Sequence, residues 1–226
     1  MPGTLYIIAT PIGNLDDVSP RTIETLRSLD LLLCEDTRVT GHLLHRYDIK
    51  IPMKPYREDL HFKKVSEVIA LLKEEKTVGL VSDAGTPGIA DPGFRLVRDV
   101  LATAPDTVVI PIAGPSAVTT ALSASGLPAD QFVFLGFPPH KKGRNGFFKE
   151  AMEQSRTVVL YESTHRIEKA LTALHGIDPN RYLVVARELT KLHETFYRGT
   201  AMEIVDALRT TSSKGEFVIM IAAQKS

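Results

Sequence analysis

The chain has 226 residues, of which 43% are hydrophobic, and its 27 Lys and Arg residues balance its 27 Asp and Glu residues. This composition excludes a disordered chain and is typical of a globular protein with one large or two small domains, while zero net charge means that any polyanionic partner must be bound by a local patch. The single cysteine, Cys34, excludes an internal disulfide, and no segment approaches 18 continuous apolar residues, so we expect a cytoplasmic protein without a membrane partner.

The first half of the chain alternates short apolar runs with amphipathic segments. Ser19 and Pro20 are typical of the start of a helix, and a further helix is expected from about residue 61 to residue 75. Five strands alternating with helices predict a doubly wound, mostly parallel sheet. The pattern locates four of these strands, at residues 4–10, 31–34, 78–81 and 108–112.

Residues 82–93 form a loop with three glycines, two prolines and two aspartates, directly after the apolar strand at 78–81. A loop in that position lies at the carboxyl edge of the sheet, where open α/β folds bind ligands. Its glycine spacing matches neither the dinucleotide-binding motif nor the P-loop. Asp91 and Pro92 are expected to be the N-cap and the first residue of the next helix. The loop therefore predicts a ligand site, with a turn-rich connection that binds nothing as the alternative.

Gly114-Pro-Ser116 punctuates the chain and predicts a domain boundary, which divides it into residues 1–113 and 114–226. Consecutive strands near 182–187 and 194–199 suggest a hairpin, so the second sheet is expected to be mixed. Its strands are expected at 132–135, 157–161, 182–186, 195–197 and 217–222, and its helices near 143–155, 165–175 and 201–210.

Residues 140–149 hold four cations and no acidic residue, which in a neutral chain makes a local positive patch. Such a patch favours contact with phosphates, although a solvated loop is the simpler alternative. Histidines 42 and 45 have no carboxylate or thiol spaced to complete a metal site, so we expect no metal. The cations of the patch are Lys141, Lys142, Arg144 and Lys149.

Seven stretches, in this order, span nearly the whole chain: GTLYIIATPIGNLDD, CEDTR, VGLVSDAGTPGIADPG, PIAGPSAVTTALSASGLP, FLGFPP, LYESTHRI and ARELTKLHET. Together they resemble the tetrapyrrole methylase-like methyltransferases. The resemblance implies two α/β domains of the tetrapyrrole methylase type, S-adenosylmethionine in the cleft between them, and a homodimer. The first loop, Ala9-Thr-Pro-Ile-Gly13, departs from the Gly-x-Gly-Pro-Gly pattern of the porphyrin enzymes.

That departure favours the branch of the family that acts on ribosomal RNA. The resemblance then implies 2′-O-methylation of a cytidine ribose, with small-subunit ribosomal RNA or the assembled small subunit as the partner. One alternative is a methyltransferase of the same fold that acts on a small molecule such as a tetrapyrrole, or on a modified protein residue. A second alternative is an RNA-binding assembly factor without turnover.

The resemblance also implies which residues contact the cofactor. They are Pro11, Asp83, Ala84, Gly85, Ile89, Ser116 and Thr119 in the first half and the hinge, and Leu160, Tyr161, Ala186 and Leu189 in the second half.

A ribose hydroxyl is a weak acid, so methyl transfer to it needs a base or a cation near the oxygen. Candidates are Glu35, Asp36, Glu188 and Lys191, and the amine of Lys191 requires a lowered pKa to act as a base. Arg38 and Arg187 are interpreted as phosphate contacts, like the patch, because a guanidinium offers a planar fork for two oxygens. For residues 35–38 the alternative is a helix N-cap with an ion pair.

Overall fold

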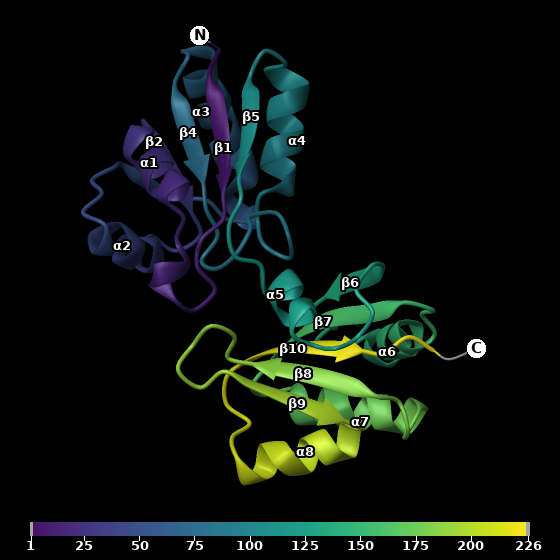
Figure 1. The fold of residues 1–226 in the computed structure, drawn as a ribbon. Coiled ribbons are helices and arrows are strands. Elements are labelled where there is room, and N and C mark those ends of the chain that lie inside the picture. The colour runs from purple at the N-terminus through teal and green to yellow at the C-terminus, as the bar shows by residue number, and fades with distance from the viewer. Residues whose placement is uncertain (1, 225–226) are drawn as a thin grey trace. The chain divides into compact units, whose positions relative to one another are not determined.

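The computed structural model describes residues 2–224 and divides into two compact units, Met1–Ser116 and Ala117–Ser226 (Figure 1). Each unit is built on its own five-stranded sheet. The domain boundary after residue 113 stays a prediction. The first residue of the first predicted domain and residues 225–226 of the second lie outside the described residues.

The sheet of the first unit has the order β3-β2-β4-β1-β5, and every neighbouring pair is parallel. This confirms the predicted parallel sheet. The strand that the pattern did not locate is β3, which has only three residues and ends in a proline. The strands are β1 (Thr4–Ile8), β2 (Leu31–Cys34), β3 (Met53–Pro55), β4 (Thr77–Leu80) and β5 (Val108–Ile112).

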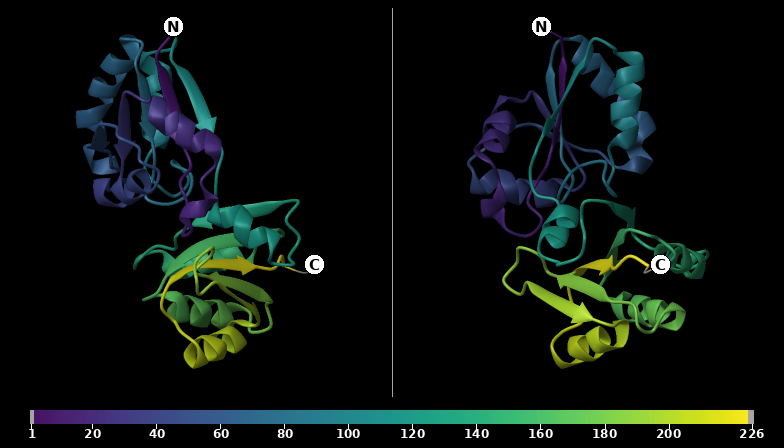
Figure 2. Two further views of the ribbon diagram at one scale, coloured as in Figure 1. Left: turned by 60° about the vertical axis from the view of Figure 1, so that its left-hand side comes forward. Right: turned by 45° about the vertical axis from the view of Figure 1, so that its right-hand side comes forward.

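Helices cover both faces of this sheet, as a doubly wound fold requires (Figures 1 and 2). Helices α1 (Pro20–Ser28) and α2 (Thr37–Arg46) pack against one face, in a core that includes the buried Cys34. Helices α3 (His61–Lys73) and α4 (Phe94–Thr103) pack against the other face. Short 3₁₀ turns, η1 (Leu15–Asp17) and η2 (Glu58–Leu60), precede α1 and α3. The predicted start of α1 is confirmed, because the Ser19 hydroxyl accepts the backbone N–H of Thr22.

The sheet of the second unit is mixed, with the order β6-β7-β10-β8-β9. Only the pair β6 and β7 is parallel, and β8 and β9 form the expected antiparallel hairpin. The strands are β6 (Phe132–Gly136), β7 (Thr157–Ser163), β8 (Leu183–Arg187), β9 (Thr195–Gly199) and β10 (Glu216–Ile221).

Helices α6 (Arg144–Met152), α7 (Ile167–Ile177) and α8 (Ala201–Thr210) share one core with alternate residues of the second sheet. Helix α5 (Ala117–Ser123) packs against β10, on the opposite face from α7 and α8 (Figure 2). Helix α8 begins with a capping box between Thr200 and Glu203. Among residues 2–224, no helix is long and apolar enough to cross a bilayer.

Candidate functional site

The loops that leave the strands of the first sheet gather at one edge, because all of its strands are parallel. Thr10, in the loop after β1, donates its N–H to the Gly85 carbonyl at 2.9 Å, and the Gly85 N–H donates back to Thr10 at 3.1 Å. The Thr10 hydroxyl also donates to the carbonyl of Ser82 at 3.1 Å. Gly114, after β5, approaches so closely that a Cβ there would lie 2.9 Å from the Ala9 Cβ. Three loops thus form one packed surface at the edge where α/β folds bind ligands.

The helix after the central loop begins later than predicted. Its N-cap is Gly93, so Asp91 is not the N-cap and Pro92 is not the first helical residue. Gly93 has a φ of 143°, a conformation that favours glycine, and a Cβ there would lie 2.9 Å from the Cδ2 of Leu80. The interpretation of Asp91 and Pro92 as the helix start is therefore wrong, and the Asp91 carboxyl belongs to the loop.

Carboxylates of different strength lie along this edge. Burial raises the pKa of Asp91 to about 6, with smaller contributions from the charges of Glu35 and Asp83. Burial and the charge of Asp83 also raise the pKa of Glu35. Hydrogen bonds from the side chain and the backbone of Arg38 hold the pKa of Asp36 below its usual range. The edge therefore has two carboxyl groups whose pKa values are raised and one whose pKa is lowered.

Residues 35–38 form the N-cap and ion pair that we considered as the alternative. The Asp36 carboxylate accepts the backbone N–H of Arg38 at 2.8 Å and caps α2. It also binds the guanidinium of Arg38 through two nitrogens, although that side chain is 86% exposed. The Asp36 N–H donates to Asp83 at 3.0 Å, which ties the second loop to the central one. Arg38 remains accessible to a phosphate, but only in competition with its own carboxylate.

The predicted cofactor residues of the first unit are close in space, with one exception. Pro11 and Gly85 are buried in the packed loops, and Asp83 is half-buried among the carboxylates. Ser116, which ends the unit, follows β5 at the same edge. Ile89 is the exception, because its half-exposed side chain lines an apolar groove of about 380 Å³ between the central loop, β1, β4 and α4. Ala84, between Asp83 and Gly85, is exposed.

Two predicted cofactor contacts of the second unit are fully buried strand residues. Leu160 and Ala186 each have no exposed surface, in the side chain or in the backbone. Tyr161, on β7, is half-buried, and its ring packs edge-on to Phe134 with centroids 4.9 Å apart. Leu189 is buried just after β8, whereas Thr119 is exposed on α5.

The loop after β8 is strained and braced by charge. Glu188 and Thr190 have φ values of 51° and 65°, in the left-handed region that disfavours residues with a side chain. Lys191 donates to Glu188 at 3.0 Å and to Glu216 at 2.8 Å. Burial alone would lower the pKa of the Lys191 amine, but the two carboxylates outweigh it and raise that pKa. The lowered pKa that a base role for Lys191 requires is therefore absent.

Arg144 of the predicted phosphate patch faces inward. Its guanidinium donates to the fully buried carboxylate of Glu162 at 2.6 Å, and only 15% of its side chain is exposed. Arg166 binds the same carboxylate at 3.0 Å and also donates to His140. The Arg144 guanidinium lies 4.9 Å from the centre of the Phe148 ring. This arrangement fixes residues 137–143 against the end of β7. Both arginines are paired within the protein and are therefore less available to a phosphate.

The other predicted phosphate contacts are more accessible. Lys141 and Lys142 are exposed in the loop before α6. Lys149 lies further along α6, 4.0 Å from Glu153. Arg187, at the end of β8, donates to two backbone carbonyl groups.

A buried polar network in the first unit was missed by the sequence analysis. The hydroxyl of Tyr56 and Nδ1 of the fully buried His61 are 2.8 Å apart, and Nε2 of His61 lies 2.9 Å from Asp99. These residues join the end of β3 to α4, and no sequence pattern links positions so far apart. Among residues 2–224, no group of three or more His, Cys, Asp or Glu residues could hold a metal ion.

This fold and site define the class of the protein. It is a two-unit α/β protein with a long Gly- and Pro-rich loop at the carboxyl edge of a parallel sheet. The family model of the Tetrapyrrole (Corrin/Porphyrin) Methylases matches residues 4–205. A solved structure of a cobalamin biosynthetic enzyme, cobalt precorrin-4 methyltransferase, matches with a TM-score of 0.68 at 19% identity, over 97% of this chain and 94% of that one. This second likeness concerns the fold alone.

Two curated relatives carry the name "Ribosomal RNA small subunit methyltransferase I". The relative from Thermotoga maritima is 40% identical over 99% of this chain and 100% of its own length. The relative from Synechocystis sp. is 44% identical over 97% of this chain and 79% of its own length. The chain belongs to the tetrapyrrole methylase family, in the group with these relatives.

Proposed function

We propose that this protein transfers a methyl group from S-adenosylmethionine to small-subunit ribosomal RNA, at the 2′-hydroxyl of a cytidine. The observation that carries the proposal is identity of 40% or more, over nearly the whole chain, to proteins named for methylation of that RNA. The cationic loop at residues 141–142 supports an RNA substrate. We further propose that the protein acts as a homodimer.

The packed edge of the first sheet suits the cofactor chemically. S-adenosylmethionine supplies an electrophilic methyl group on a sulfonium, and it carries a ribose diol, an ammonium and a carboxylate. The half-buried carboxylates of Glu35, Asp83 and Asp91 can accept hydrogen bonds from hydroxyl and ammonium groups. Ala84, which follows Asp83, is exposed. These residues, with the other predicted contacts in both units, are our proposed cofactor site.

Glu35 is the strongest candidate base among the four residues proposed for catalysis. Its raised pKa makes it a better proton acceptor than Asp36 or Glu188, whose pKa values are lowered. For Glu188, burial would raise the pKa, but bonds from the Glu216 N–H and from Lys191 outweigh it. The substitution Glu35→Gln should therefore reduce kcat and remove the acidic limb of the pH–rate profile. Asp36→Asn should keep that limb, and an unchanged profile in Glu35→Gln would remove Glu35 from the base role.

Lys191 is better suited to act as a cation than as a base. With its pKa raised, the amine stays protonated at neutral pH and can stabilise an oxygen that gains negative charge. The substitution Lys191→Gln should lower kcat without shifting the pH–rate profile. A shifted profile would instead assign Lys191 the titrating role.

The alternative is a methyltransferase of the same fold that acts on a small molecule or a modified protein residue. The zero net charge of the chain is compatible with such a substrate. One solved structure of the same fold is a precorrin methyltransferase. Its identity of 19% is far below that of the ribosomal relatives.

Methyl-labelled S-adenosylmethionine distinguishes these possibilities. The protein is incubated with the label and with either small ribosomal subunits or naked ribosomal RNA from cells that lack it. We expect label at one nucleotide whose phosphodiester resists alkaline hydrolysis, because a methylated 2′-oxygen cannot attack the phosphate. Binding of the cofactor without labelled RNA would favour the small-molecule alternative. Absence of cofactor binding would contradict both readings and leave the assembly factor.

A further inference from the structure

The register of the second sheet brings four loops together at one edge. Ser163, at the end of β7, pairs with Glu216 at the start of β10, and Arg187 at the end of β8 pairs with Thr195 at the start of β9. Because β6 runs parallel to β7, the loop after β6 lies at this edge as well. We call residues 137–144, 162–166, 187–194 and 212–216 the second-sheet edge.

This edge concentrates positive charge in a chain that has none overall. It contains seven Lys or Arg residues against four Glu residues, with the histidines counted as neutral. The cations are Lys141, Lys142, Arg144, Arg166, Arg187, Lys191 and Lys214, and the carboxylates are Glu162, Glu188, Glu194 and Glu216.

Three of the cations form ion pairs within the protein. Arg144 and Arg166 share the buried Glu162, and they are 15% and 19% exposed. Lys191 lies between Glu188 and Glu216. These internal pairs neutralise three of the four carboxylates, so they brace the loops without adding attraction for an anion.

The remaining four cations form two groups. Lys141 and Lys142 are exposed in the loop after β6. Arg187 donates Nε to the carbonyl of Lys214 at 2.6 Å, which fixes the guanidinium without neutralising it, and the Lys214 side chain is exposed. Among the ion pairs of residues 2–224, none involves any of these four. The fourth carboxylate, Glu194, accepts the backbone N–H of Thr190 and forms none of the ion pairs above. The scaffold thus holds four cations outside ion pairs and one such carboxylate, an excess of three positive charges.

We propose that the second-sheet edge is a track for the RNA backbone, with Lys141 and Lys142 at one end and Arg187 and Lys214 at the other. Three inter-strand spacings separate β6 from β8 in the order β6-β7-β10-β8. At about 4.8 Å each, they amount to roughly 14 Å. A stacked strand presents one phosphate about every 3.4 Å of its axis, so the two groups contact different phosphates. Lys214 is thereby added to the proposed phosphate contacts, and Arg144, which is paired with Glu162, is removed from them.

This inference rests on the proposed function, because it identifies how that substrate is held. It also explains how a neutral chain binds a polyanion. Backbone contacts of this kind position the RNA and carry no sequence information. The nucleotide to be methylated is therefore selected elsewhere.

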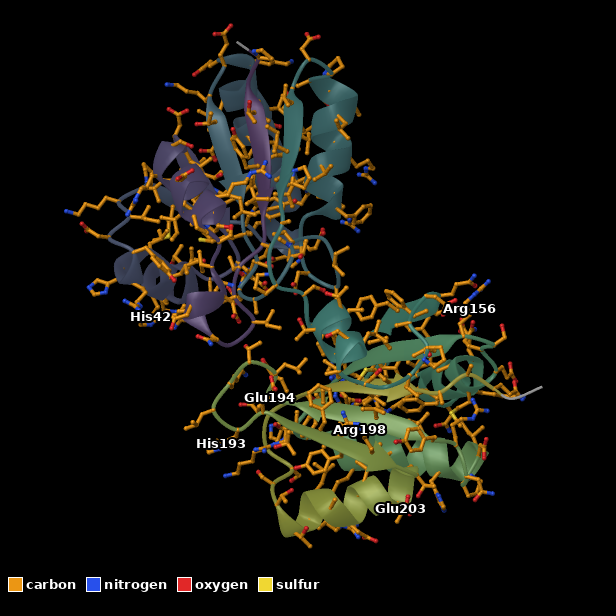
Figure 3. All side chains as sticks on the ribbon, in the orientation of Figure 1. His42, Arg156, His193, Glu194, Arg198 and Glu203 are labelled. Atoms are coloured by element: carbon orange, nitrogen blue, oxygen red, sulfur yellow. The ribbon has the colours of Figure 1, made fainter. Side chains whose placement is uncertain are left out.

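The test measures the affinity of a small-subunit ribosomal RNA fragment over a range of salt concentrations, without the cofactor. The variants are Lys214→Gln and the double change Lys141→Gln with Lys142→Gln. Arg156→Gln is the matched control, because Arg156 is exposed on the same sheet before β7, at the opposite end from His193 and Glu194 (Figure 3). Each variant removes exposed positive charge, and circular dichroism verifies its fold.

Each lost phosphate contact reduces the slope of log affinity against log salt concentration by about 0.7. We expect a reduction of about 0.7 for Lys214→Gln and about 1.4 for the double variant, with no reduction for Arg156→Gln. Unchanged slopes, or an equal loss in Arg156→Gln, would overturn the track. Slopes that change as expected in a protein that methylates no RNA would support the track and overturn only the proposed reaction.

Discussion

Glu162 is the most deeply buried charged group in the second unit, and its substitution tests how the edge of that sheet is held together. Its carboxylate has no exposed surface, and it accepts Arg144 at 2.6 Å, Arg166 at 3.0 Å and the N–H of Ser163 at 2.8 Å. Glu162→Gln preserves the shape and one acceptor oxygen, but it removes the charge that two arginines share. Each guanidinium is then left largely buried without a counter-charge.

Removing one partner of a buried ion pair costs about 3–5 kcal/mol. The two arginines are 15% and 19% exposed, so water recovers part of this cost, and the glutamine oxygen retains some hydrogen bonding. We therefore expect a loss of roughly 2–3 kcal/mol in the free energy of unfolding. For a unit of this size, the corresponding decrease in Tm is about 4 °C or more per kcal/mol.

Calorimetry is the suitable assay, because the two units can unfold in separate transitions. Glu168→Gln is the control, since Glu168 pairs with Arg209 at the surface, where the two side chains are 39% and 58% exposed. An exposed pair contributes at most about 1 kcal/mol. A loss for Glu162→Gln no larger than that of the control would refute the bracing role, and so would additive effects of Glu162→Gln and Arg144→Gln in a double-mutant cycle.

Three further substitutions test the first unit. Asp91→Asn should stabilise the protein above pH 6 and have no effect below about pH 3, because the folded-state pKa of about 6 exceeds the ordinary 3.8 and the ionised form is therefore the destabilising one. The full shift corresponds to about 3 kcal/mol, and the partial exposure of Asp91 reduces the expected gain to about 1–2 kcal/mol. Urea unfolding across this pH range, with exposed Asp106→Asn as control, measures it. Tyr56→Phe leaves Nδ1 of the buried His61 without its partner and should cost about 1–3 kcal/mol in urea unfolding, whereas no loss would mean that the bond contributes nothing. Gly93→Ala should cost about 1–3 kcal/mol because its φ of 143° strains any side chain, and an unchanged Tm would show that the loop relaxes.

The alternation of strands and helices could be read from the sequence, because buried strands and amphipathic helices leave strong periodic signals. The hairpin of β8 and β9 and the Ser19 cap were predicted for the same local reasons. Strand β3 could not be located, since three residues ending in proline carry no period.

The start of α4 was misplaced because Asp91 and Pro92 imitate a capped helix. The competing factor is tertiary: Gly93 packs against Leu80 in a conformation that favours glycine, and the helix begins only after it. Local preference is overridden here by contact with the core.

The candidate site was predicted in part, and its electrostatics were not. The carboxyl-edge loops follow from strand order, so Thr10, Asp36 and Asp83 come together as a parallel sheet requires. Whether a cation is free or paired depends on residues distant in sequence, however. Arg144 faces Glu162, 18 positions away, and Lys191 faces Glu216, 25 positions away. Composition could therefore count the charges of the patch but could not identify the available ones.

The separation of charge between the two sheets explains why the neutral total is uninformative. Glu35, Asp36, Asp83 and Asp91 make the edge of the first sheet acidic, whereas the second-sheet edge has an excess of cations. The second-sheet edge therefore suits phosphate groups better than the first, where the exposed Arg38 is already paired with Asp36. The acidic edge can then serve groups that donate hydrogen bonds or a proton, which phosphates do not. Binding of the polyanion and removal of a hydroxyl proton make opposite electrostatic demands, and we propose that the second-sheet edge meets the first of them and Glu35, on the acidic edge, the second.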